Sequence, residues 1–185
     1  MKKVFFCLVF SAILVCSMSY GQTFDILKTG QTNSCVVGDD GDLQRGITAP
    51  DPRFLDNADG TIIDLATGLM WVQAPHSLSN NASSMTWTEA ITFCNELEFA
   101  GHDDWVLPSR RELMSLLDYG HLNENLALPD GNPFSGLAPS GSGYWTGTSS
   151  ALDSNSAWRV YINMASVLYG SKGGFCFVWP VRSWQ

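Results

Sequence analysis

The densest group of reactive side chains lies in GHDDWVLPSRREL, residues 101–113, with one histidine, two aspartates, two arginines, a serine and a glutamate. A catalytic triad needs a base beside an activated hydroxyl or thiol, and a third group that orients the base. An exported enzyme that uses Asp103, Asp104 and Glu112 is therefore one interpretation. No Gly-x-Ser-x-Gly turn accompanies His102 and these carboxylates, however, and a structural role is the favoured interpretation.

Two of these groups are explained by the start of a helix. Ser109 is followed three residues later by Glu112, the capping-box pattern in which each side chain satisfies an unpaired backbone N–H at the other residue. The pattern predicts a helix over residues 109–117. Thr86 and Glu89 repeat it in TWTEAITFCNEL, whose apolar residues recur at helical spacing.

The remaining segments indicate short strands and loops. Residues 61–73 predict a hairpin that turns near Gly68, and residues 75–85 have the composition of a surface loop. The glycine-rich stretch 119–143 is too long for an ordinary connection. SAWRVYI and FCFVWPVRSW predict strands near the end of the chain, the latter with Phe175, Phe177, Trp179 and Val181 on one face and Cys176, Val178 and Arg182 on the other. This order of elements is typical of the α+β class.

The first residues predict export. Lys2 and Lys3 precede an apolar run and small residues, which indicates a signal peptide over residues 1–21. Lipid attachment at Cys16 is a weaker alternative, because the large Val15 precedes it. The mature protein would be periplasmic, on the cell surface or secreted, without a membrane span.

One domain is expected after export. Residues 22–52 are polar and turn-rich and predict an extended N-terminal segment, followed by a single domain over residues 53–185. Loss of Lys2 and Lys3 with the signal takes the formal charge from −8 to −10. Such a charge repels phosphate backbones and anionic lipid, so it argues against nucleic acid as a partner.

The sequence offers little for a metal ion. The three histidines are too scattered for a zinc site. Asp56 and Asp59 leave calcium possible, although Leu55 would occupy the first ligand position of an EF-hand loop. Because such Asp-Gly stretches are usually turns, no cofactor is expected.

The mature chain has Cys35, Cys94 and Cys176, which allow three pairings. Cys94 lies on the apolar face of the first predicted helix and Cys176 in a predicted terminal strand, so both are expected to be buried. That placement favours a Cys94–Cys176 disulfide. Cys35 would then stay free or pair with another chain.

The candidate ligand-binding residues fall in two groups. Tyrosines could form a stacking surface for a sugar or a protein, and polar residues of the long loop could add hydrogen bonds. The polar group comprises Asn123, Glu124, Asp130 and Asn132, and the tyrosines are Tyr144, Tyr161 and Tyr169.

Five motifs in order resemble one family. They are PRFLDNADGTIIDLATGLMW, TWTEAITFCNEL, GHDDWVLPSRRELMSLLDY, GYWTGTSS and VWPVR. The chain resembles the family typified by the C-terminal domain of the Legionella collagen-like adhesin, and LPSRREL is also similar to a motif of formylglycine-generating enzymes and other C-type-lectin-like folds. The resemblance implies a C-type-lectin-like fold, with two helices packed on a twisted antiparallel sheet and a long loop region.

The resemblance also bears on function. It supports the Cys94–Cys176 bridge, because a first-helix cysteine in lectin-like domains commonly pairs with the last strand. The adhesin domain is associated with sulfated polysaccharides and self-association, whereas the acidic charge of this chain argues against polyanions. The sugar-binding triplets of calcium-dependent lectins and the paired cysteines of formylglycine-generating enzymes are both absent.

We therefore expect an exported, non-enzymatic and adhesin-like binding module that recognises a glycan or a surface protein. One alternative is a subunit of a cell-surface assembly, which could be a homo-oligomer. The other is the exported enzyme considered above.

Overall fold

The computed structural model describes residues 26–81, 83–121 and 126–184. One antiparallel sheet contains, in this order, β1 (Phe54–Asp56), β2 (Thr61–Asp64), β3 (Leu69–Val72) and β7 (Val181–Ser183). The second sheet contains β4 (Tyr144–Ser149), β5 (Ser156–Tyr161) and β6 (Ser166–Ser171). The helices are α1 (Asp40–Leu43), α2 (Trp87–Asn95) and α3 (Arg110–Met114), with 3-10 turns η1 (Pro75–Ser77) and η2 (Ile162–Met164).

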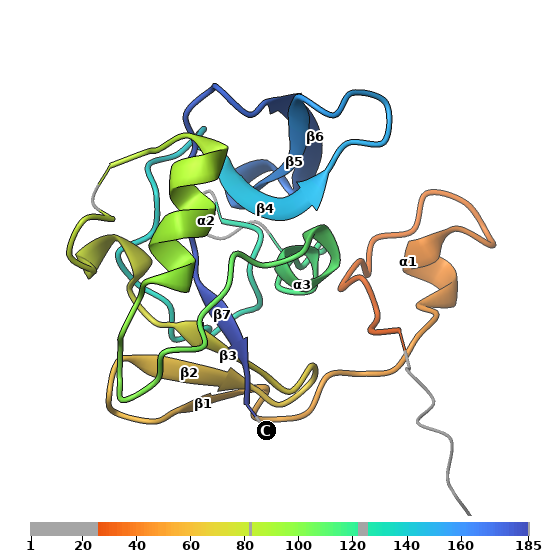
Figure 1. The fold of residues 1–185 in the computed structure, drawn as a ribbon. Coiled ribbons are helices and arrows are strands. Elements are labelled where there is room, and N and C mark those ends of the chain that lie inside the picture. The colour runs from red at the N-terminus through yellow and green to blue at the C-terminus, as the bar shows by residue number, and fades with distance from the viewer. Residues whose placement is uncertain (1–25, 82, 122–125, 185) are drawn as a thin grey trace, which may run out of the picture.

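The arrangement confirms the α+β class but divides the expected single sheet in two. Figure 1 shows the two sheets at opposite ends of the molecule, with α2 and α3 between them. β1 and β7 are the two edge strands of the same sheet, so the beginning and the end of the domain both belong to it. The segment that carries α1 lies beside α3 (Figure 1).

The predicted hairpin of residues 61–73 is confirmed. β2 pairs with β3 in antiparallel register, from Thr61 opposite Val72 to Asp64 opposite Leu69. Gly68 takes a positive φ of 68° in the turn, where a residue without a Cβ is favoured. The Asp64 carboxylate accepts a hydrogen bond from the backbone N–H of Ala66, which fixes the turn from inside.

Both predicted helices are present and both begin at the predicted caps. Thr86 precedes α2 and Ser109 precedes α3, each with a complete capping box. α3 is shorter than the expected 109–117, because the N–H groups of Leu116 and Leu117 bond to carbonyls three residues back instead of four. Leu116 and Leu117 remain buried, so the apolar pattern identified the core correctly.

Tryptophans hold the irregular backbone together. The indoles of Trp71, Trp105, Trp145 and Trp179 are at most 1% exposed. Three of them donate Nε1–H to a backbone carbonyl, as Trp179 does to Val72 at 2.8 Å. Each such bond satisfies the single polar atom of a large apolar ring, so a buried indole can anchor segments without regular structure.

The predicted strand over residues 175–184 is wrong for most of its length. Only β7 is a strand, and the preceding residues make isolated bridges such as Met85 with Cys176. The expected alternation fails too, because Phe175 is 66% exposed while Cys176 and Val178 are buried. The segment passes between two clusters of the core, so residues of both parities find apolar neighbours.

The loop 75–85 is also less superficial than predicted. Leu78 and Asn81 are buried. The Asn81 amide donates to the carbonyls of Pro75 and Val178, at 2.8 and 3.0 Å. A buried amide that bonds two segments fixes the loop to the C-terminal part of the chain.

The described part of the segment 22–52 is more ordered than the expected extended lead-in. Asp39 caps α1, and Leu27 bridges Ile47 in parallel. The backbone N–H of Tyr119 donates to the carbonyl of Thr29 at 2.7 Å, which attaches the segment to the domain.

Candidate functional site

The charged cluster of residues 101–113 is largely committed to the fold. The Ser109 N–H donates to Oε2 of Glu112 at 2.6 Å, and the Glu112 N–H donates to Oγ of Ser109 at 3.3 Å. Both side chains therefore close the first turn of α3, as the capping box predicted. Thr86 and Glu89 make the equivalent contacts at α2.

Asp104 is occupied by a partner from the other end of the chain. Nε and Nη2 of Arg182 donate to its two carboxylate oxygens, at 2.5 and 3.0 Å. The hydrogen bond from Arg182 lowers the pKa of Asp104, so the carboxylate stays ionised. A carboxylate held in this way acts as a tie between Asp104 and β7, not as a proton-transfer group.

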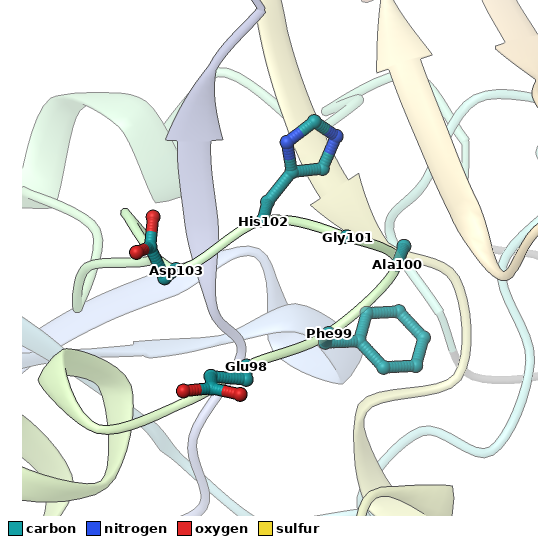
Figure 2. A pocket seen from close by; sticks show the side chains of 6 residues that line it. All are labelled: Glu98, Phe99, Ala100, Gly101, His102 and Asp103. Atoms are coloured by element: carbon teal, nitrogen blue, oxygen red, sulfur yellow. The ribbon is translucent and has the colours of Figure 1, made fainter.

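A shallow hollow lies beside the cluster, and a single turn of the chain forms it. Residues 98–103 line it, and Phe99 and His102 pair across the turn. Figure 2 shows the side chains radiating from this turn, with the His102 imidazole and the Glu98 carboxylate pointing in opposite directions. The groups do not converge on a common point, whereas a catalytic site needs acid and base to face the same atom.

The predicted polar binding residues are largely used inside the chain. Asn123 and Glu124 lie outside the described residues. Asp130 contacts Nε2 of His121 at 2.6 Å. Asn132 donates to the carbonyl of Pro129 and accepts from the N–H of Phe134, an arrangement typical of a turn.

The long loop that carries these residues is buried where its second described part begins. Ala127 and Leu128 are each 1% exposed, within the main core cluster. The Ala127 N–H donates to the carbonyl of Ile162 at 2.8 Å. These two residues therefore fasten the loop to the core beside η2.

The three predicted tyrosines do not form one surface. Tyr144 is 2% exposed, and its hydroxyl accepts a hydrogen bond from the N–H of Ala138. Tyr161 and Tyr169 point to opposite faces of the second sheet, because Tyr169 pairs with Trp158 and residues 158 and 161 differ in parity on β5. The expected stacking surface is corrected: only Tyr169 of the three is strongly exposed, at 48%.

The possible calcium ligands are engaged in turn contacts. Asp56 accepts from the N–H of Ala58 and from the Gln73 amide. Asp59 accepts from both the N–H and the hydroxyl of Thr61. In the described part of the chain, no three acidic, histidine or cysteine side chains gather as metal ligands would.

The expected disulfide is absent. Cys94 and Cys176 are buried in one apolar cluster, yet both are free thiols. The Cys176 sulfur instead accepts a hydrogen bond from Nη1 of Arg159 on β5 at 3.6 Å. Burial raises the pKa of Cys94 to about 12 and also raises that of Cys176. Cys35 is exposed.

The sheet β4–β5–β6 instead carries a line of cationic and aromatic side chains. The Arg110 guanidinium lies 4.5 Å above the ring of Trp158. Trp158 packs edge-on against Tyr169, with ring centroids 5.5 Å apart. We call Arg110, Trp158 and Tyr169 the aromatic strip. It runs from the start of α3 across β5 to β6 on a single face.

Local backbone contacts position the strip. The Arg110 N–H donates to the Thr148 hydroxyl at 3.0 Å, and the Gly147 N–H donates to the carbonyl of Pro108 at 2.8 Å. A Cβ at Gly147 would lie 3.1 Å from the Leu107 carbonyl oxygen, so the close approach of this segment to β4 favours glycine. The guanidinium is thereby held over a ring on a neighbouring element.

Further cations lie on aromatic rings around the same sheet. The Arg159 guanidinium is 5.4 Å from the centre of the Trp145 ring, and the Lys172 ammonium is 4.1 Å from that of Trp87. Neither cation has a carboxylate within salt-bridge distance among the described residues. Cation–π contacts of this kind contribute roughly 0.5–1 kcal/mol each at exposed sites.

Sequence reasoning identified Tyr169 but missed Arg110 and Trp158. Arg110 stands inside the capping motif, where attention fell on Ser109 and Glu112. Trp158 stands two residues before the buried Val160 on β5, and nothing in the strand pattern set it apart from the core residues. The signal that could have found the strip is the pair of a tryptophan in a strand and an arginine at a helix start, but their contact depends on tertiary packing.

Comparison with known proteins supplies a family. No helix among the described residues is long and apolar enough to cross a membrane. No curated protein matches the chain. The profile of the Lcl C-terminal domain family matches residues 60–182, which include both capping boxes, the sheet β4–β5–β6 and the start of β7. The chain therefore belongs to the Lcl C-terminal domain family.

Proposed function

We propose that the chain is an exported, adhesin-like and non-enzymatic module that binds a glycan through the aromatic strip. Membership of the Lcl C-terminal domain family is compatible with an adhesin-like role. The observation that carries the proposal is the line formed by Arg110, Trp158 and Tyr169. Arg110 and Trp158 are half-buried and Tyr169 is 48% exposed, so the strip reaches solvent at its Tyr169 end, whereas the side chains of the hollow beside His102 do not converge.

The chemistry of the strip suits sugars. The C–H faces of a pyranose ring carry slight positive charge and pack on the negative face of an aromatic ring. Tyr169 adds a polar hydroxyl at the edge, and the Arg110 guanidinium offers several N–H donors to hydroxyl groups. Because the chain is strongly acidic overall, uncharged glycans are better ligands than sulfated ones.

A C-type-lectin-like fold is part of the same proposal. Two helices, antiparallel sheets and a shared sheet for the beginning and end of the domain support it. Fold alone does not fix the ligand, so the proposal depends on the strip and not on the fold.

The test is a binding screen with uncharged and sulfated glycans and with surface proteins, in the presence of calcium and of a chelator. We expect a calcium-independent glycan hit that Tyr169→Ala weakens by about five- to tenfold, since one aromatic contact is removed. Trp184→Ala is the matched control, because Trp184 is 47% exposed and lies beyond β7 on the other sheet.

Three results would contradict the proposal. One is a glycan hit that both variants weaken equally. Another is a glycan hit that needs calcium. The third is binding to surface proteins alone, which would identify the partner as a protein.

A further inference from the structure

A second concave region lies along α3 and the residues that follow it, and none of the three strip residues lines it. It has a volume of about 420 Å³ and is enclosed by residues 26–29, the β2–β3 turn at residues 66–67, Arg53 and α3 with the residues that follow it. We call it the α3 pocket. Its size falls within the roughly 300–1,000 Å³ that is typical of small-ligand sites.

The lining combines an apolar surface with positive charge. Met114, Leu117 and Tyr119 supply apolar and aromatic surface, and Tyr119 is 43% exposed. Lys28 and Arg111 are exposed at the same pocket and make no ion pair with any described residue. No acidic side chain is among the described residues that line it, although the chain carries eighteen acidic and ten basic residues.

The neighbouring hollow shows that this charge is local. It lies along the same N-terminal segment and shares Lys28, Arg53 and Leu117 with the α3 pocket. Its lining also includes Asp51, Asp118 and Asp130, however. Lys28 and Arg53 therefore line both hollows, whereas Arg111 lines only the α3 pocket, whose described lining has no acidic residue.

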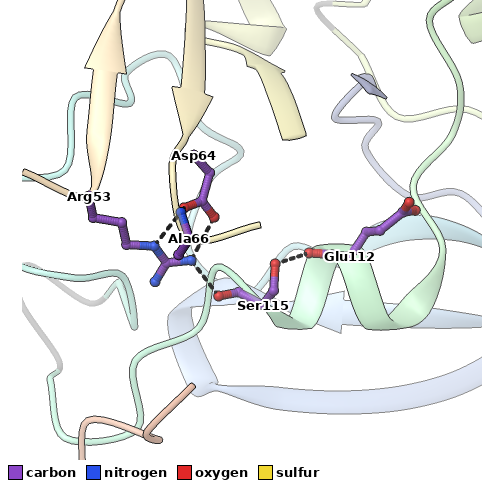
Figure 3. A network of polar contacts seen from close by, with 5 residues as sticks. All are labelled: Arg53, Asp64, Ala66, Glu112 and Ser115. Carbon is purple, nitrogen blue, oxygen red and sulfur yellow. Dashed lines mark hydrogen bonds and ion pairs between the residues drawn. The ribbon is translucent and has the colours of Figure 1, made fainter. Parts of the chain in front are cut away.

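A buried cation supports the wall of the pocket. The Arg53 side chain is 10% exposed, with Nε and Nη2 committed to Asp64 and Nη2 also to the carbonyl of Ser115. Figure 3 shows the third nitrogen, Nη1, outside the drawn contacts. Asp64 neutralises most of the Arg53 charge, so Lys28 and Arg111, which form no ion pair with a described residue, supply the positive charge of the pocket.

The N-terminal wall is built into the fold. Gly30 and Gly120 approach so closely that a Cβ on Gly120 would lie 1.9 Å from the Gly30 carbonyl oxygen. The Thr29 hydroxyl is occupied by Asp40, which lies outside the lining. The segment therefore closes the pocket with its backbone held against the residues that follow α3.

We infer that the α3 pocket binds an amphipathic carboxylate, in which an apolar group of about the size of a phenylalanine side chain adjoins one carboxylate. The apolar group packs against Met114, Leu117 and Tyr119. The carboxylate accepts hydrogen bonds from the side chains of Arg111 and Lys28 at the rim. Hydrogen bonds between charged groups are stronger than those between neutral groups. Both a free small acid and the C-terminal residue of a peptide present this chemistry.

The experiment titrates the purified protein by calorimetry with N-acetylphenylalanine, with its amide, and with acetate. We expect saturable binding of the carboxylate, about fivefold weaker or no binding of the amide, and no measurable binding of acetate. Binding of the carboxylate should weaken between 0.05 and 0.5 M salt, since screening acts on exposed charges. Equal binding of the amide and the carboxylate would overturn the inference.

Variants locate the site. Arg111→Gln should weaken binding about two- to fivefold, whereas Arg45→Gln, an exposed arginine outside the lining, should leave it unchanged. Equal affinities in the two variants, or no saturable binding in any of the titrations, would also overturn the inference. Circular dichroism of each variant checks the fold.

Two further measurements distinguish a peptide C-terminus from a free small acid, and the α3 pocket from the proposed glycan site. Tighter binding of a tripeptide that ends in phenylalanine than of N-acetylphenylalanine identifies a peptide C-terminus, and equal binding identifies small acids; both support the pocket. Tyr169→Ala should leave carboxylate binding intact, because Tyr169 lies on the strip. The pocket and the proposed glycan site can therefore fail independently.

Discussion

Arg53 and Asp64 form a bidentate ion pair inside the domain, with Nε and Nη2 of the arginine 3.0 and 2.8 Å from the two carboxylate oxygens. The Asp64 side chain is fully buried. Its carboxylate also accepts the Ala66 N–H of the β2–β3 turn, and Arg53 reaches the Ser115 carbonyl just after α3. Figure 3 shows the pair connecting the first sheet to α3. It is thus a structural tie across the core.

Replacement of Arg53 by methionine should strongly destabilise the protein. The change leaves the Asp64 carboxylate buried without a cation, which costs about 3–5 kcal/mol of unfolding free energy. Urea denaturation measures the loss. Asp104→Asn is the matched control, because it breaks the more exposed Arg182–Asp104 pair and should cost at most about 1 kcal/mol. Similar losses in the two variants would contradict the role assigned to burial.

Glu112→Ala should lower the unfolding free energy by about 0.5–2 kcal/mol, since it removes one half of the α3 capping box. Glu89→Ala should act similarly at α2. Ser154→Ala, at an exposed position between β4 and β5, is the control and should be neutral. The alternative enzyme hypothesis makes a different prediction: an activity that collapses in Glu112→Ala without any matching loss of stability.

His76 should make the protein less stable in mild acid. Its ring stacks on that of Phe177 with ring centroids 4.5 Å apart, and burial lowers the pKa of His76 below its usual value of 6.5. The unfolded chain therefore takes up a proton near pH 6.5 before the folded protein does. This contribution to stability is intact above that pH and falls as pH drops toward the folded pKa.

The measurement is the thermal midpoint of the wild type and of His76→Phe between pH 7.5 and 5. We expect the wild type to lose more stability on acidification than the variant does. His102→Gln serves as the control, because it removes a different histidine and should keep the wild-type slope. A wild-type slope in His76→Phe would show that burial of this imidazole does not govern the acid response.

Features that depend on neighbours along the chain could be predicted from the sequence. Ser109 and Glu112 are three residues apart, and the side chain of each accepts a hydrogen bond from the backbone N–H of the other. Both partners of these bonds are therefore present in the local sequence pattern. The β2–β3 turn is similar, since Gly68 and the flanking apolar runs specify it locally. These devices placed both helices and the first hairpin.

Features that depend on distant partners could not be predicted in this way. Asp104 is explained by Arg182, and Arg110 by Trp158; neither pairing leaves a trace in local spacing. Tyr144 resembled a binding residue, but its hydroxyl is satisfied by Ala138 inside the core. Polar and aromatic side chains suit both a core and a site, and only packing decides between the two uses.

The free state of Cys94 and Cys176 leads to a prediction about alkylation. In the folded protein, iodoacetamide should modify Cys35 rapidly and the other two thiols very slowly, because Cys35 is exposed while burial raises the pKa of both others. In denaturant without reductant, all three cysteines of a chain that begins at residue 22, without Cys7 and Cys16, should be modified. Mass spectrometry counts the adducts, and Cys35→Ser provides the control that removes the rapid one.

The denaturing arm separates free thiols from a bridge. A Cys94–Cys176 disulfide would leave a single modified cysteine in denaturant and three only after reduction. Free thiols instead give the same three adducts with or without reductant, since no bond needs to be broken. A count of one in unreduced denaturant would therefore contradict the structure at this position and restore the pairing expected from the sequence.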